Sequence, residues 1–126
     1  MKIKLEDALA LNSLYQLLKD QKMSFKTSYS LRQLNEATEK HTKFYSDEMA
    51  KLLEDYAMRN PDGSFVYTAA GDSIQLQPEF VNECANRIAE LTSIEVDVPD
   101  VELPMSEFEH IELTPAQVGA IMKFIV

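Results

Sequence analysis

The chain has 126 residues, of which 45% are hydrophobic and 26% charged, and these proportions exclude a wholly disordered protein. No apolar run approaches the ~20 residues of a membrane span, and no signal-peptide core follows the N-terminus, so we expect a soluble intracellular protein. The single cysteine, Cys84, excludes an internal disulfide and a thiolate zinc cluster. The net charge of -9 argues against a nucleic-acid-binding protein.

Two amphipathic helices are predicted at the start of the chain. Apolar residues at three- and four-residue steps indicate one helix over residues 5–20. A second helix begins between Ser24 and Ser30 and reaches about Met58, a length of about 45 Å. We expect the first helix to pack antiparallel on the second and to cover only part of its apolar stripe. That stripe consists of Leu34, Ala37, His41, Tyr45, Met49, Leu52 and Tyr56, widened by Phe44 and Leu53.

A small hairpin and a third helix are predicted next. The sequence NPDGS at residues 60–64 ends the long helix, because proline cannot continue it and Asp-Gly favours a turn. Residues 65–68 and 74–77 are typical of two short strands joined by a loop. Pro78 suits the first turn of a helix. We expect this helix to bury Phe80, Val81, Cys84, Ile88 and Leu91.

A strand and a last helix complete the chain. Alternating apolar and acidic residues over 94–98 predict a strand with one acidic face open to water. Thr114 as N-cap, Pro115 at the first helical position and Gln117 three residues after the cap form a capping box. The apolar stripe of this helix would be Val118, Ile121, Met122 and Ile125.

The sequence therefore predicts an α+β fold that is mainly α. Its parts are an antiparallel helical hairpin with one long helix, a small β-hairpin or sheet, and a C-terminal helix. We expect one domain over residues 1–126, with the helical hairpin in 1–60 and an acidic α+β part in 61–126. The first part carries a net charge of +1 and the second a net charge of -10.

No pattern indicates catalysis, and we expect no catalytic residue, no metal site and no cofactor. His41 on the long stripe and Cys84 on the third helix are interpreted as structural residues. Acidic side chains gather around His110, but their spacing matches no calcium loop and no zinc helix. Weak surface binding of a cation is the most that we allow there. The residues concerned are Glu107, Glu109, His110 and Glu112.

Aromatic and apolar residues predict a surface for a protein partner. The long stripe exceeds what the first helix covers, and a lone two-stranded hairpin is marginal in water. The uncovered residues pack either on the rest of the chain or on another protein. The candidate partner-binding residues are Tyr45, Met49, Leu52, Tyr56, Phe65 and Tyr67.

The order of several short segments resembles a known group of proteins. KIKL at residues 2–5 precedes a leucine-rich helix, and MSFKTSYSL at 23–31 opens a long charged helix. NPDGS at 60–64 ends that helix, and IELTPAQ at 111–117 opens a short apolar one. The chain is similar in these features to small proteins encoded by tailed bacteriophages and prophages. The group brings no established activity, and the resemblance implies a phage context.

Two functions follow as hypotheses. The first is a non-enzymatic virion structural or assembly protein that binds a phage virion protein or a host protein, with a homo-oligomer as a further alternative. The second is an acidic inhibitor or decoy of a host protein, such as an anti-defence factor. We expect neither nucleic acid nor membrane as a partner, and a location in the bacterial host cytoplasm or the virion. A purely solubilising role of the acids stays open. The acidic surface would be Glu95, Asp97, Asp100, Glu102, Glu107, Glu109 and Glu112.

Overall fold

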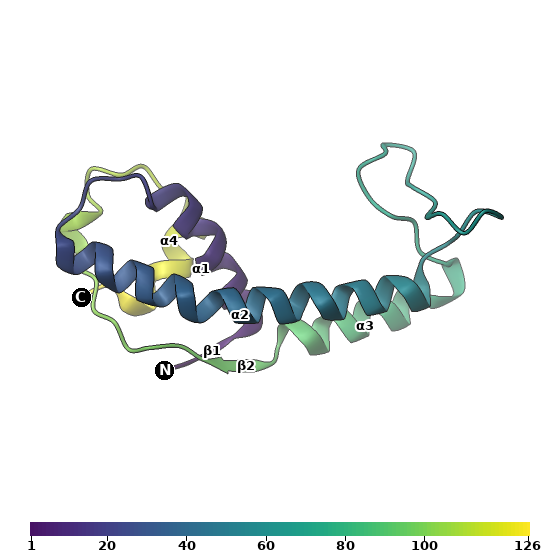
Figure 1. Ribbon diagram of the computed structural model, residues 1–126, viewed down its shortest axis with the longest axis horizontal. Helices are drawn as coiled ribbons and strands as arrows, with labels where there is room; N and C mark the ends of the chain where they lie inside the picture. Colours follow the sequence, from purple (N-terminus) through teal and green to yellow (C-terminus); the bar gives the residue numbers. More distant parts are fainter. The chain divides into compact units, whose positions relative to one another are not determined.

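The computed structural model describes residues 1–126 and confirms an α+β fold that is mainly α (Figure 1). Four α-helices, a two-stranded antiparallel sheet and three short 3₁₀ helices make up the regular structure. Their bounds are β1 Lys2–Lys4, α1 Leu5–Leu18, α2 Phe25–Tyr56, η1 Pro78–Phe80, α3 Val81–Thr92, β2 Glu95–Asp97, η2 Met105–Glu107, α4 Pro115–Ile121 and η3 Met122–Phe124.

The chain forms two compact units, and each has its own core. Unit 1 consists of residues 1–43 and 93–126, and unit 2 of residues 44–92. These boundaries differ from the division after Asn60 that the charge pattern suggests. Unit 1 holds nine Lys or Arg and twelve Asp or Glu, a net charge of -3, whereas unit 2 holds three and nine, a net charge of -6. The smaller unit therefore carries most of the excess acid.

The core of unit 1 lies between α1, the first turns of α2 and the C-terminal segment. In Figure 1, α1 and α4 lie beside each other in this unit. Leu103 and Phe124 are the largest apolar side chains of this core that are fully enclosed. The other buried apolar members of this core are Ile3, Ala8, Leu11, Leu14, Leu18, Leu31, Leu34, Val98, Phe108 and Ile121.

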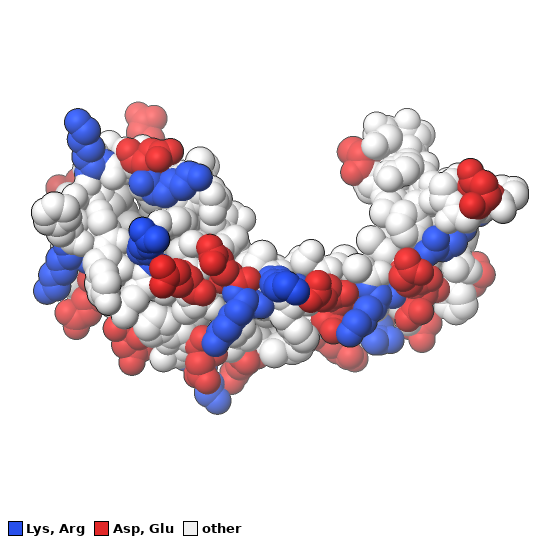
Figure 2. All heavy atoms as spheres, in the orientation of Figure 1, with Lys and Arg blue, Asp and Glu red and all other residues white.

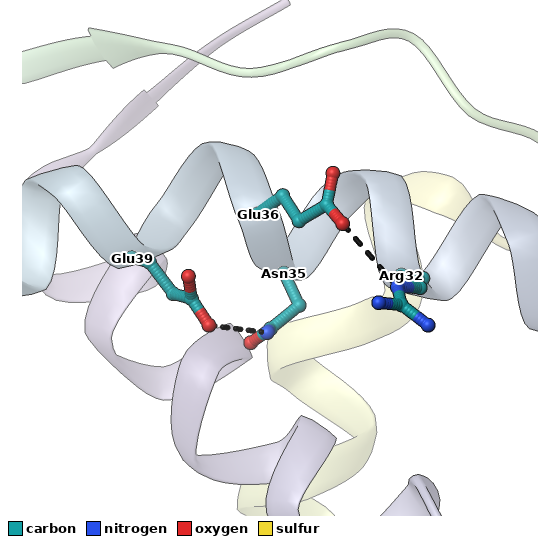
Figure 3. Close-up of polar contacts among 4 residues, drawn as sticks. All are labelled: Arg32, Asn35, Glu36 and Glu39. Carbon is teal, nitrogen blue, oxygen red and sulfur yellow. Dashed lines mark hydrogen bonds and ion pairs between the residues drawn. The ribbon is translucent and has the colours of Figure 1, made fainter.

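A polar contact connects α1 to α2 within this core. The Asn12 side-chain amide donates to Asn35 Oδ1 at 2.9 Å. Asn35 in turn donates to Glu39 Oε1 at 3.1 Å, as Figure 3 shows, so both ends of this amide are satisfied. Because a buried amide without partners is costly, the pair favours one register of the two helices.

The sheet joins the N-terminus to the predicted acidic strand. β1 and β2 are antiparallel, and Lys2 lies opposite Asp97 and Lys4 opposite Glu95. Each acid on the wet face of β2 thus faces a lysine across the strand pair, an arrangement that favours pairing. The sequence predicted β2, but not that residues 2–4 would be its partner.

Unit 2 combines the later turns of α2, α3 and the connection between them. In Figure 1, α3 runs beside these turns of α2. Leu52, Tyr56 and Cys84 form its buried centre, with Met49, Leu76, Phe80 and Ile88 packed around them. The steps from 49 to 52 to 56 and from 80 to 84 to 88 are those of two helix faces that meet.

The predicted strands over 65–68 and 74–77 are not formed. Three segments, residues 57–60, 64–68 and 73–77, instead pair with one another at single positions. The backbone N–H of Met58 donates to the carbonyl oxygen of Gln75, Gln75 to Val66, and Val66 to Met58, at 2.9, 2.8 and 3.0 Å. Since each residue donates to one neighbour and accepts from another, this three-segment junction closes on itself and no ladder extends.

Two helix faces also differ from the prediction. Val81, at the first position of α3, is 45% exposed, and the buried residues of this helix are Cys84 and Leu91. Val118 and Met122 are exposed as well, whereas Phe124 is 1% exposed. The capping box at Thr114 is formed as predicted, but α4 ends at Ile121 and tightens into η3. The tighter winding turns Phe124, rather than Met122, toward the core.

Candidate functional site

An open apolar groove in unit 2 is the main candidate site. It has a volume of about 450 Å³. α2 contributes Met49, Leu52 and Leu53, which are three and four residues apart and therefore share one face. α3 contributes Cys84 and Ile88. The third wall comes from the three-segment junction and the turn before its last segment, with Tyr67, Asp72, Ser73, Ile74 and Leu76.

Three of the six predicted partner-binding residues line this groove. They are Met49, Leu52 and Tyr67, and the Tyr67 side chain is 58% exposed. An exposed aromatic ring beside an apolar floor is typical of a protein-binding surface. Figure 2 shows the region of residues 57–77, at the upper right, as mostly uncharged.

The other three residues lie elsewhere in unit 2. Tyr56 is buried against Phe80, with ring centroids 5.7 Å apart. Arg59 lies over the Phe65 ring at 4.5 Å, so this aromatic already has a partner. Tyr45 is half-buried and does not line the groove.

The polar groups of the groove are already engaged. Asp72 Oδ1 accepts hydrogen bonds from the Thr68 and Ser73 hydroxyls, both at 3.2 Å. Cys84 is a free thiol, 2% exposed, at the groove floor. The groove thus offers apolar area and an acidic edge, but few groups that would orient a small polar ligand.

Unit 1 carries two exposed apolar surfaces that the sequence did not single out. On α2, Phe25 is 97% exposed and Tyr29, one turn later, 67%. The buried face of this helix runs through Thr27 and Leu31. A shift of two residues on a helix is about 200°, so Phe25 and Tyr29 lie on the opposite side. Extending the predicted apolar stripe backwards from Leu34 in helical steps leads to Leu31 and Thr27. It therefore leaves Phe25 and Tyr29 outside the stripe, and the sequence could have shown this.

The second surface lies around α4. Met105, Val118, Met122 and Val126 are each at least 39% exposed. A small hollow of about 130 Å³ separates some of them, lined also by Phe108 and Ile125. The sequence has no charged residue between Glu112 and Lys123, and this is the signal from which the surface could have been predicted.

All seven predicted acidic residues lie in unit 1, and two of them, Asp100 and Glu107, have polar partners within it. Glu95 and Asp97 face lysines across the sheet. Asp100 lies 3.2 Å from the Met1 amino group, and the Glu107 carboxylate accepts from the Ser24 backbone N–H at 3.3 Å. The remaining members, Glu102, Glu109 and Glu112, are exposed.

The two histidines are the other titratable candidates. His41 Nε2 lies 3.2 Å from the Asp97 carbonyl oxygen, which only accepts, so the ring donates from this nitrogen. His110 is exposed. No group of three or more His, Cys, Asp or Glu side chains is placed to hold a metal ion.

Comparisons with known proteins add no relative. No family model, no curated protein and no solved structure matches this chain. The resemblance to phage-encoded proteins therefore stays a prediction. None of the helices combines the length and the apolar character needed to cross a membrane.

Proposed function

We propose that this chain is a non-enzymatic protein-binding protein, and that its partner binds in the groove of unit 2. The observation that carries this proposal is the open apolar groove between α2, α3 and the three-segment junction. Three residues chosen from the sequence as partner-binding line it.

A protein partner fits the groove better than a small polar ligand. Its walls are mostly aliphatic or aromatic, and the Asp72 carboxylate is held by neighbouring hydroxyls. Binding an apolar side chain there removes Tyr67 and Leu53 from water without leaving a buried polar group unpaired. In the phage context that the sequence suggests, we propose a role in virion structure or assembly.

The acidic-decoy hypothesis has less support. A mimic of a nucleic-acid backbone needs carboxylates that are free to face a basic groove. Glu95 and Asp97 lie opposite lysines, and Asp100 pairs with the Met1 amino group. Most of the net negative charge, -6 of -9, lies in unit 2, whereas the seven residues named for the decoy all lie in unit 1.

Affinity purification from phage-infected bacterial cells, read by mass spectrometry, tests the proposal. The bait is the tagged chain, co-expressed with an untagged copy, and the groove variant carries Leu53→Lys and Tyr67→Lys. We expect the groove variant to lose at least one protein that the wild type retains, because lysines desolvate poorly on an apolar floor. The matched control, Met105→Lys with Met122→Lys, changes two exposed apolar residues of unit 1 and should retain it. Recovery of the same proteins by wild type and groove variant would contradict the proposal.

A further inference from the structure

The most exposed aromatic side chain of the protein lies on α2 in unit 1. Phe25 is 97% exposed and Tyr29 is 67% exposed, four residues apart on the same face. Large exposed apolar side chains that are adjacent mark interaction surfaces more often than single ones do. We call Phe25, Tyr29 and the neighbouring Lys22 and Lys26 the aromatic-basic face.

This face carries two lysines that form no ion pair, although the Glu107 carboxylate lies beside it, 3.3 Å from the Ser24 backbone nitrogen. Residues 19–32 hold four Lys or Arg and one acid. Arg32 pairs with Glu36 at 3.3 Å, as Figure 3 shows. Lys22 and Lys26 are exposed and make no ion pair. The free positive charge of the face therefore comes from these two lysines.

The groove of unit 2 is apolar, as the aromatic rings of this face are, and unit 2 carries the opposite charge. It is lined by apolar residues with Asp72 at its edge, and unit 2 has a net charge of -6. Its volume of about 450 Å³ falls within the roughly 300–1,000 Å³ that is typical of ligand pockets. Opposite charges at the rim would orient the approach.

We propose that the aromatic-basic face of one chain binds in the unit 2 groove of a second copy of this chain. This inference rests on the proposed function and names the partner of the same groove. The two surfaces differ, so the contact is heterologous and leaves one face and one groove free on every dimer. Association therefore continues beyond the dimer as rings or open chains, a property suited to a structural or assembly protein.

The contact is small, and we expect it to be weak. Two aromatic side chains bury about 150–250 Å² each, well below the ~1,600 Å² of a standard interface. Sedimentation velocity at protein concentrations from about 5 to about 500 µM covers the dissociation constants of such a weak contact. The average mass of the wild type should rise with concentration. If the face bound the groove of its own chain, or bound nothing, the protein would stay monomeric over this range. Either result overturns the inference.

Variants separate the two halves of the contact. The face variant, Phe25→Ser with Tyr29→Ser, should stay monomeric, and its exposed positions make loss of folding a minor concern. The groove variant, Leu53→Lys with Tyr67→Lys, should stay monomeric too, with its folding checked by circular dichroism. The control Leu17→Ser removes another exposed apolar residue, 55% exposed on α1, and should associate as the wild type does.

Mixing the two variants gives the sharpest test. The face variant keeps an intact groove, and the groove variant keeps an intact face. An equimolar mixture should therefore form a dimer and nothing larger, although each variant alone is monomeric. A mixture that stays monomeric, or that forms species beyond the dimer, overturns the heterologous contact.

Photo-cross-linking locates the contact directly. With p-benzoylphenylalanine in place of Phe25, we expect cross-links between copies, to peptides that contain Leu53 or Ile88. Cross-links to the α4 surface instead would overturn the inference. The affinity purification separates failure of this inference from failure of the proposed function. If the groove variant changes the recovered proteins and the face variant does not, the groove binds a partner other than a second copy. The proposed function then stands.

Discussion

At the scale of single residues, the turn after α2 is held by one acidic side chain. Asp62 Oδ1 accepts from the Ser64 hydroxyl at 2.6 Å and from the Ser64 backbone N–H at 3.0 Å. Between them Gly63 has a φ of 88°, a conformation that glycine adopts at no steric cost. The sequence NPDGS is thus a turn with an identifiable mechanism.

These hydrogen bonds hold the pKa of Asp62 below its ordinary value of 3.8, with the Ser64 hydroxyl as the main cause. The carboxylate therefore stabilises the turn above the unfolded-state pKa, and this contribution is lost as the pH falls through the lower, folded-state pKa. We expect Ser64→Ala to raise the Asp62 pKa toward 3.8. An NMR titration of the side-chain carboxyls measures it. An unchanged Asp62 midpoint would contradict this assignment.

At the scale of elements, a capping box fixes where the last helix begins, and a change to 3₁₀ winding marks where it ends. The Thr114 hydroxyl accepts from the Gln117 backbone N–H at 3.3 Å, and the Gln117 side chain accepts from the Thr114 N–H at 2.8 Å. This reciprocal pair satisfies two N–H groups that the helix itself leaves free. Beyond Ile121 the chain continues as η3.

Loss of the cap should be measurable. Thr114→Ala removes the hydroxyl and should lower the free energy of unfolding by about 1 kcal/mol. Thr114→Ser keeps the hydroxyl and should lose only a fraction of that amount. Urea unfolding followed by circular dichroism compares the two. Equal losses in both variants would mean that the hydroxyl is not the stabilising group.

The 3₁₀ winding predicts a sharp difference between two nearby residues. Phe124 is 1% exposed and Met122 is 51% exposed. Phe124→Ala should therefore cost about 3–5 kcal/mol in unfolding free energy, as for other buried phenylalanines. Met122→Ala, at a surface position, should change it by less than about 0.5 kcal/mol. A larger loss of unfolding free energy for Met122→Ala than for Phe124→Ala would contradict this prediction and would favour the stripe predicted from the sequence.

At the scale of the whole molecule, two cores share one helix. The buried cluster of unit 1 and that of unit 2 have no residue in common, although α2 contributes to both. Elements with separate cores open as separate cooperative units more readily than elements that share one.

Amide hydrogen exchange tests this independence. Leu52→Ala creates a cavity in the core of unit 2 and should speed exchange in α3. The amides of β1 and β2 in unit 1 should change much less. Leu14→Ala, its counterpart in unit 1, should show the opposite pattern. Uniform acceleration over both units in either variant would show that the protein opens as one.

Periodicity and local chemistry were sufficient to predict most elements. α1, α2, α3, β2 and α4 follow from apolar spacing, from the proline and glycine positions and from the capping box at Thr114, because all of these act within a few residues. The groove residues Met49 and Leu52 follow from the same helical spacing. The Asp62 turn is equally local.

Contacts between distant segments were decided only by the tertiary structure. Residues 2–4 become a strand because they meet residues 95–97, and residues 65–77 form no strands because a third segment competes for their backbone groups. The distribution of charge was also decided by the tertiary structure. The halves of the sequence carry net charges of +1 and -10, but the folded units carry -3 and -6. The difference arises because residues 93–126 fold back onto the basic N-terminal part. The sequence alone determined the faces of the helices, and the fold decided which of them stay open.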